Sequence, residues 1–252
     1  MKLNLVPART GLTWVRQGIR IFVRQPLAIG GLFFMFMAAV SVVALVPLIG
    51  PVLAMALVPA GTLGLMSASA EADQGRFPMP SQLIAAFRRS PAHTRAMLTL
   101  GSLYAACGIA VTLLSGLIAP LPAADPGDSA VILSPAFQEA MLVTLALYLP
   151  VSVLFWHAPA LVHWHGVSPA KSLFFSAVAC WRNKGAFVVY CVAWAGVFLI
   201  GGVVVVLIGR LFGSPQAAAT AMMPLAMIMA SMFFASIVFT VNDSFVADDP
   251  PV

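Results

Sequence analysis

Three of the four histidines in this 252-residue chain lie close together, at His157, His163 and His165, beside Trp156 and Trp164. Imidazole is the commonest metal ligand in proteins, so the cluster could bind a metal ion. On one continuous helix, however, His157 and His163 lie about 240° apart and His163 and His165 about 200° apart, so they share no face. Unless the helix breaks and the fourth histidine approaches, we expect these rings to anchor the chain at a membrane–water interface and to bind no metal.

Carboxylates inside apolar segments are the next candidates, because ionisable groups in a membrane often carry protons or ions. Glu139 lies about one turn inside an apolar run, whereas Glu71 and Asp73 end another run near Arg76. Glu139 could be a gate or a proton site, but an exposed carboxylate in a first helical turn also suits the helix dipole. We favour that interpretation and take Glu71 and Asp73 as solvated charges. The apolar runs therefore offer little to an ion-driven pump.

Sulfur-bearing residues and catalytic motifs make no stronger case. Five methionines between positions 222 and 232 could bind Cu(I), a soft ion, but they spread around a helix and suit packing. Cys107, Cys180 and Cys191 lie in or beside apolar runs and are expected to act as small hydrophobes. The sequence contains no nucleophile elbow, phosphate-binding loop, dinucleotide fingerprint or zinc-protease motif. We therefore expect a protein that is not an enzyme and holds no cofactor.

Six long apolar runs make up most of the chain and must position all these residues. Hydrophobic residues account for 61% of the chain and charged residues for only 8%, against about 25% charged residues in soluble domains. A helix of about 20 apolar residues spans the hydrocarbon core of a bilayer. We predict an all-α polytopic membrane protein with one integral membrane domain over residues 1–252. The predicted spans are residues 27–46, 48–70, 96–118, 136–164, 185–209 and 217–241.

The distribution of positive charge indicates how these spans are oriented. Twelve of the 13 lysines and arginines lie before the first span, between the second and third, or between the fourth and fifth, and only Arg210 lies in an alternate connection. Basic residues concentrate on the cytoplasmic side of membrane proteins, so both termini are expected in the cytoplasm. The net charge of +5 then indicates attraction to anionic lipid headgroups rather than to nucleic acid. The first span is too long, and begins too far along the chain, to be a cleaved signal peptide.

A basic, aromatic segment precedes each pair of spans. Residues 10–25, 81–89 and 169–183 each have the pattern of an amphipathic helix lying in the cytoplasmic headgroup layer. Two of them end alike, at Phe22-Val23-Arg24-Gln25-Pro26 and Phe87-Arg88-Arg89-Ser90-Pro91, and the third ends similarly at Cys180-Trp181-Arg182-Asn183-Lys184. We therefore predict three related units, each an interfacial helix followed by a transmembrane hairpin. The residues predicted to anchor these helices to lipid are Trp14, Arg16, Arg20, Phe22, Arg24, Phe87, Arg88, Arg89, Trp181 and Arg182.

The fourth span contains two prolines, Pro150 and Pro159. Each proline removes a backbone hydrogen bond and should kink the helix, and discontinuous helices line the binding sites of many transporters. The candidates for lining a substrate path are therefore Tyr148, Pro150, Trp156, His157 and Pro159. The alternative is a kinked helix with a purely structural role.

Small residues in two of the spans predict close helix packing, because they let helix backbones approach one another. In the second span they are Gly61, Gly64 and Ala68, and in the fifth they are Gly196, Gly201 and Gly202. We attach no chemical role to them.

Short runs near the N-terminus carry a family resemblance: Val6-Pro7-Ala8-Arg9, Trp14-Val15-Arg16, Arg24-Gln25-Pro26-Leu27, Gly31-Leu32-Phe33-Phe34 and Pro47-Leu48-Ile49-Gly50. In these runs the chain resembles an uncharacterised family of proteobacterial six-span inner-membrane proteins. The resemblance extends over essentially the whole chain. It implies a multi-pass protein of the bacterial inner membrane, and the family has no established activity and no catalytic residues to carry over.

Two classes of function remain open. The first is a non-enzymatic membrane protein that engages lipid, or a membrane partner, through its basic interfacial helices. The second is a transporter or channel for a small uncharged or apolar solute, lined by the kinked fourth span. A polar cavity reaching mid-membrane beside residues 148–159 would favour the second, whereas clefts opening sideways between helices would favour the first. Anionic lipids are the expected partners, the sequence identifies no protein partner, and a homo-oligomer is left open.

Overall fold

The computed structural model describes residues 2–122, 131 and 134–246. Its long helices are α1 (Thr10–Arg24), α2 (Pro26–Ala44), α3 (Gly50–Asp73), α4 (Pro91–Ile118), α6 (Pro135–Phe155), α8 (Pro169–Arg182), α9 (Lys184–Leu211) and α10 (Pro215–Ser244). Two shorter helices are the 3₁₀ helix η1 (Pro80–Phe87) and α7 (Ala158–His165), and the strands β1 (Lys2–Leu3) and β2 (Phe245–Val246) have two residues each. Six segments are long and apolar enough to cross a membrane: α2, α3, α4, α6 with α7, α9 and α10. The predicted all-α chain with six spans is therefore confirmed.

Prolines and serines set where several helices begin. The third span begins at Pro91, before the predicted residue 96, because the Ser90 hydroxyl accepts a hydrogen bond from the backbone N–H of His93. Ser134 caps α6 in the same way through Phe137. A serine cap satisfies one of the free N–H groups of a first turn, and a proline inside that turn loses none. The helices therefore extend further than their apolar runs.

The predicted fourth span is two helices rather than one. The α-helix stops at Phe155 and resumes at Ala158, because Pro159 lacks the N–H that would continue the hydrogen-bond ladder. Ser176 of α8 satisfies the backbone at this break, since its hydroxyl donates to the Val153 carbonyl at 2.8 Å and accepts from the His157 N–H at 3.0 Å. Pro150 lies within α6 and does not end it.

The segment predicted as an amphipathic helix over residues 81–89 is the 3₁₀ helix η1, which ends at Phe87. Pro80 starts it and the cap of α4 follows it closely, which leaves room only for a short element of the kind that 3₁₀ helices form. On this element Ile84 is exposed, Ala86 is buried and Phe87 is half-buried.

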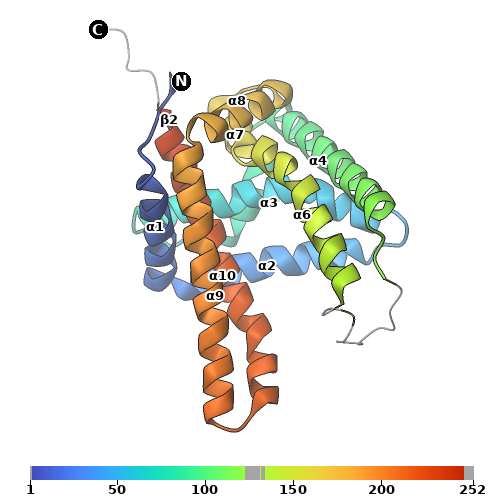
Figure 1. The fold of residues 1–252 in the computed structure, drawn as a ribbon. Helices are drawn as coiled ribbons and strands as arrows, with labels where there is room; N and C mark the ends of the chain where they lie inside the picture. Colours follow the sequence, from blue (N-terminus) through green and yellow to red (C-terminus); the bar gives the residue numbers. More distant parts are fainter. Residues whose placement is uncertain (1, 123–130, 132–133, 247–252) are drawn as a thin grey trace.

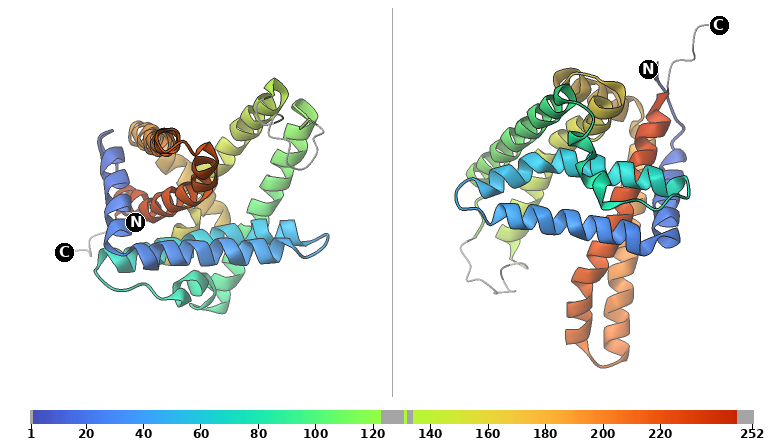
Figure 2. Two further views of the ribbon diagram at one scale, coloured as in Figure 1. Left: turned by 90° about the horizontal axis from the view of Figure 1, so that it is seen from below. Right: turned by 180° about the vertical axis from the view of Figure 1, so that it is seen from behind.

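Consecutive long helices lie against each other as α2 with α3, α4 with α6, and α9 with α10. These pairs diverge rather than forming a parallel bundle. In Figure 1, α9 and α10 project downward from the rest of the molecule, while α2 and α3 run across it at a steep angle. Figure 2 shows the same divergence from below and from behind. The helix α3 lies at the centre, in contact with α1, α2, α4, α7, α10 and η1.

The first and the last described segments of the chain meet beside the first residues of α9. Strands β1 and β2 pair antiparallel, with Lys2 opposite Val246. Asn183 holds this junction, since its Oδ1 accepts from the Val6 N–H at 3.0 Å and its Nδ2 donates to the Asn4 carbonyl at 3.0 Å. The junction holds α1 alongside the upper parts of α9 and α10 in Figure 1.

Candidate functional site

The broken fourth span lines an apolar pocket of about 290 Å³. From this span the pocket takes Tyr148, Ser152, Phe155, Trp156 and Pro159. The opposite walls come from α3, α4 and α10, through Val58, Pro59, Thr62, Tyr104, Phe233, Phe234 and Ile237. Aromatic and aliphatic groups dominate this surface, so it suits an apolar ligand and offers no charge to an ion.

Three of the five predicted lining residues face this pocket, namely Tyr148, Trp156 and Pro159. The prediction is corrected for the other two. Pro150 is exposed on another side of α6, and His157 is fully buried behind the pocket. The aromatic wall from α10 was missed, because Phe233 and Phe234 are spaced like ordinary packing residues and nothing local to them points to α6.

His157 belongs to a buried polar cluster between α7, α8 and α10. Its Nε2 lies 3.4 Å from the Thr240 hydroxyl and its Nδ1 lies 3.8 Å from the Cys180 sulfur. Burial raises the pKa of the Cys180 thiol to about 12, so this thiol stays protonated and is a poor nucleophile. The cluster therefore stabilises the helix break and resembles no catalytic dyad.

The break does bring two other histidines together. The rings of His93 and His163 have centroids 6.2 Å apart, while His165 is exposed. Over the part of the chain that the structure describes, no group of three or more histidine, cysteine or acidic side chains could hold a metal ion. The exposed Glu139 lies in the fifth position of α6.

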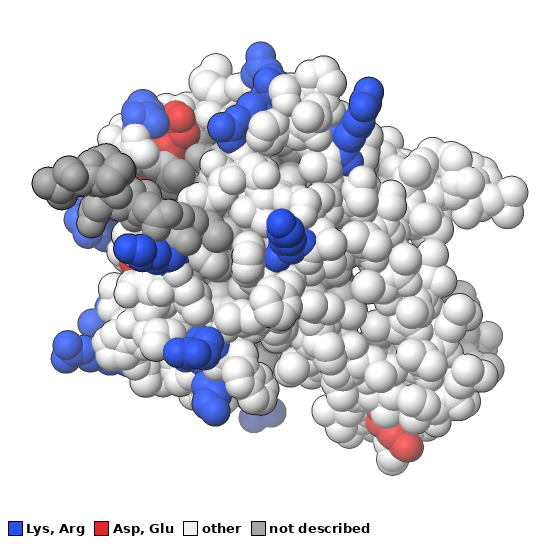
Figure 3. Space-filling view, turned by 90° about the horizontal axis from the view of Figure 1, so that it is seen from above, with Lys and Arg blue, Asp and Glu red and all other residues white. Residues whose placement is uncertain are grey.

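Most of the predicted anchoring arginines are exposed. Arg16, Arg20 and Arg24 lie on the exposed face of α1. Arg182 ends α8 beside Trp181, which is 73% exposed. Figure 3 shows lysine and arginine side chains over one part of the face seen from above, while the rest of that face is largely free of charge. Phe22 and Phe87 are half-buried against the protein.

The anchoring prediction is corrected for Trp14. Its ring is fully buried between α1, α9 and α10, and its Nε1 donates a hydrogen bond to the Asp243 carboxylate at 2.7 Å. Phe187 and Tyr190 pack against it with centroids 5.3 and 5.9 Å away. The apolar face of α1 is thus covered by protein, and its amphipathic pattern alone did not say whether protein or lipid would cover it.

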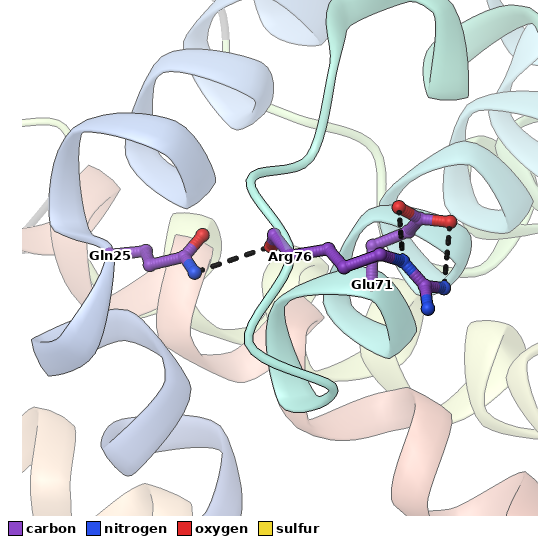
Figure 4. A network of polar contacts seen from close by, with 3 residues as sticks. All are labelled: Gln25, Glu71 and Arg76. Carbon is purple, nitrogen blue, oxygen red and sulfur yellow. Dashed lines mark hydrogen bonds and ion pairs between the residues drawn. The ribbon is translucent and has the colours of Figure 1, made fainter.

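Glu71 and Arg76 form a two-point ion pair, with Nε and Nη2 each 3.1 Å from a carboxylate oxygen. The hydrogen bond to Glu71 raises the pKa of the Arg76 guanidinium, and the negative charge of Glu71 raises it further by a smaller amount. The Gln25 amide donates to the Arg76 carbonyl at 3.2 Å, which ties the bend between α1 and α2 to the segment after α3 (Figure 4). Glu71 and Arg76 therefore form an ion pair at a solvent-accessible border, and Asp73 beside them is exposed.

Comparison with known proteins identifies one informative relative. A protein of Burkholderia thailandensis named as a probable inner membrane protein is 39% identical over 260 aligned residues, which cover 99% of this chain and 96% of the relative. No protein-family model and no solved structure matches the chain. The two proteins therefore correspond along their whole lengths, and the relative's name specifies a membrane without an activity.

Proposed function

The chain belongs to the family of this probable inner membrane protein, and we propose that its role in that membrane is to engage anionic lipid without catalysing a reaction. The observation that carries the proposal is the row of exposed arginines on α1, Arg16, Arg20 and Arg24. Each basic residue near an anionic bilayer surface contributes about 1 kcal/mol of attraction. Twelve of the 13 basic residues precede or separate the span pairs at the ends predicted to be cytoplasmic, which supports one lipid-facing surface.

The proposal includes an orientation and a repeated plan. The α1, η1 and α8 segments would lie at the cytoplasmic leaflet, each followed by a helix pair that crosses the membrane and returns. The contacts of α2 with α3, α4 with α6 and α9 with α10 support this plan. The divergence of the pairs leaves their sides open to lipid, and lipid tails are as apolar as the side chains that they would cover.

Lipid dependence of stability tests the role. We compare thermal unfolding in nanodiscs of phosphatidylglycerol and of phosphatidylcholine for the wild type, Arg20→Glu and the control Arg210→Glu. Both arginines are exposed, but Arg210 belongs to the end of the spans that is poor in positive charge. We expect the phosphatidylglycerol disc to raise the unfolding temperature of the wild type and the control, and Arg20→Glu to lose much of that gain. Equal unfolding temperatures in both discs for the wild type would overturn the proposal.

Cysteine accessibility tests the orientation. In a background with Cys107, Cys180 and Cys191 replaced, single cysteines at Arg16 and Arg182 should be shielded from a membrane-impermeant maleimide in intact spheroplasts. A cysteine at Gly213, in the turn between α9 and α10, should react. Labelling of Arg16 and Arg182 positions from opposite sides of the membrane would refute a single cytoplasmic surface.

The apolar pocket beside α6 and α7 favours a second candidate, the binding or passage of a small apolar solute. Its walls are mainly aromatic and aliphatic, as such a ligand requires. A photoactivatable diazirine fatty acid should label peptides containing residues 148–159 or 233–237. Ser152→Phe should fill the pocket and abolish that labelling. Labelling that is unchanged in Ser152→Phe would remove this candidate.

A further inference from the structure

A second, polar pocket of about 310 Å³ opens beside η1, away from the apolar one. Its lining residues are Ser81, Gln82, Ala85, Arg88, Arg89 and His163. This volume lies at the lower end of the range for small-molecule sites, about 300–1,000 Å³. The lining contains two guanidinium groups, a hydroxyl, an amide and an imidazole, and no carboxylate.

The walls of this pocket are fixed by close packing. A Cβ atom on Gly64 of α3 would lie 2.6 Å from the Leu83 Cα of η1 and 2.9 Å from the Gln82 carbonyl oxygen. Only a glycine allows the two backbones to approach so closely. On the other side, the Arg89 guanidinium donates to the His163 carbonyl of α7. The pocket is therefore held between η1 and the end of the broken fourth span.

Neither Arg88 nor Arg89 forms an ion pair with a carboxylate that the structure describes. Among the residues that the structure describes, the one ion pair joins Arg76 to Glu71. Glu71 lines an adjoining pocket that shares Gln82, Ala85 and His163, and Arg76 already occupies both of its oxygens. Arg88 and Arg89 thus supply two positive charges to the pocket, and a guanidinium with five N–H donors retains most of them after one contact.

Two guanidinium groups without a described carboxylate partner, beside a hydroxyl and an amide, match a phosphate group. The oxygens of a phosphate accept the paired N–H donors of arginine. A phosphate monoester carries about −1.5 to −2 charges at neutral pH, which two arginines balance. The pocket lies in the connection between α3 and α4, both candidate spans, where a lipid headgroup would be found.

We propose that the η1 pocket binds a phosphate monoester, with Arg88 and Arg89 as its charge partners, and that a lipid headgroup such as that of phosphatidic acid presents it. The proposal rests on the proposed function, because it names the lipid chemistry that one part of the basic surface recognises. It differs in requiring one defined site, whereas diffuse attraction requires only net charge.

The experiment measures binding to the purified full-length protein in uncharged detergent, by native mass spectrometry and by titration calorimetry. The probes are dioctanoyl phosphatidic acid, dioctanoyl phosphatidylglycerol, dioctanoylglycerol and inorganic phosphate. We expect one phosphatidic acid per protein, weaker binding of phosphatidylglycerol, which is a diester, and no specific site for the uncharged dioctanoylglycerol. Inorganic phosphate binding as tightly as phosphatidic acid would support the site and assign it to free phosphate instead of lipid.

Variants separate the pocket from general charge. Arg88→Gln with Arg89→Gln should weaken phosphatidic acid binding by at least about tenfold, because both charge-assisted hydrogen-bond donors are lost. The control Lys171→Gln with Arg210→Gln removes the same charge from exposed positions outside the pocket and should bind within about twofold of the wild type. Arg88→Lys with Arg89→Lys keeps both charges but removes the planar guanidinium groups that can bind a phosphate at two points. We therefore expect an intermediate loss of phosphatidic acid affinity.

The outcomes distinguish the two proposals. Equal losses in the glutamine pair and in the control pair would overturn the pocket while leaving lipid engagement by net charge intact. Absence of any phosphatidic acid binding to the wild type would also overturn the pocket, whatever the nanodisc experiment shows. If the glutamine pair does not fold, the lysine pair decides, and binding by the lysine pair equal to that of the wild type would argue against arginine recognition.

Discussion

Helices α3 and α9 are both long apolar segments, yet they lie in opposite environments. In α3, 56% of the most apolar stretch is buried inside the protein, whereas in α9 the share is only 6%. The buried helix is rich in alanine and serine, and the exposed one in valine, leucine and isoleucine. In a soluble protein the order would be reversed. In lipid, exposing large aliphatic groups costs little, and small residues gain most from close helix contact.

Helix α9 differs within itself as well. In its N-terminal part, Ala186, Tyr190 and Trp194 are buried against α1 and α10. Beyond Gly196 its large side chains are mostly exposed, and α10 is the neighbour that runs beside it (Figure 1). The projecting part of α9 and α10 is therefore held in place from one end.

The largest effect on the free energy of unfolding is expected where α1 packs against the N-terminal part of α9. Trp14→Ala removes the fully buried ring and its hydrogen bond to Asp243, and truncating a buried aromatic residue costs about 3–5 kcal/mol. Trp181→Ala is the matched control, because Trp181 is 73% exposed. This substitution should change the free energy of unfolding by less than about 1 kcal/mol. Chemical denaturation in detergent measures both. Losses of the same size would mean that Trp14 does not hold the projecting part of α9 and α10 in place.

Glycines sharpen the contrast between the two helices. Gly64→Ala places a methyl group 2.6 Å from the η1 backbone, and such overpacking costs about 1–3 kcal/mol. A Cβ atom on Gly196 of α9 meets nothing within 4 Å, so Gly196→Ala should stay within about 0.5 kcal/mol of the wild type. Thermal unfolding in one detergent compares them. A stable Gly64→Ala protein would show that α3 and η1 are less closely packed than the structure has them.

These glycines also show that contacts between segments far apart in the chain could not be predicted from the sequence. The six spans were predictable, because the length of an uncharged apolar run is a local property. Gly64 and Gly196 are equally small and equally apolar in sequence, and only the position of a distant helix decides that one is a contact and the other is not. Trp14 is the same kind of case, since its partner Asp243 lies at the far end of the chain.

The candidate site was predicted only in part for a related reason. Pro150 and Pro159 both suggested a kink, but only Pro159 coincides with the break, where Ser176 of α8 replaces the lost backbone partners. The arginines of the η1 pocket were identified from the sequence, while the hydrogen bond from Arg89 to the His163 carbonyl was not. That contact depends on the broken helix turning its end toward η1.

Removing the hydroxyl of Ser176 should have the next effect in size. Ser176→Ala leaves the buried His157 N–H without its partner, and leaves the Val153 carbonyl with only the 3.9 Å contact from the Cys180 sulfur. The expected cost is about 1–3 kcal/mol. Ser102→Ala is the control, because the Ser102 hydroxyl is exposed and bonds only to Leu98 of its own helix. Denaturant titrations followed by tryptophan fluorescence report the difference. Equal stability of the two variants would indicate that the break needs no support from α8.

The smallest effect is expected on the exposed length of α9, where Leu207 is 59% exposed. Leu207→Ala should change the free energy of unfolding by less than about 0.5 kcal/mol. The Leu207 side chain contacts lipid or detergent in both the folded and the unfolded state, so its removal affects the two states alike. Leu63→Ala on α3 is the matched substitution, since Leu63 is fully buried, and it should cost about 2–5 kcal/mol. Should Leu207→Ala prove as costly as Leu63→Ala, the outer face of α9 would be packed against protein. A second copy of the chain would then be the partner to seek, and a dependence of the Leu207→Ala penalty on protein concentration would identify it.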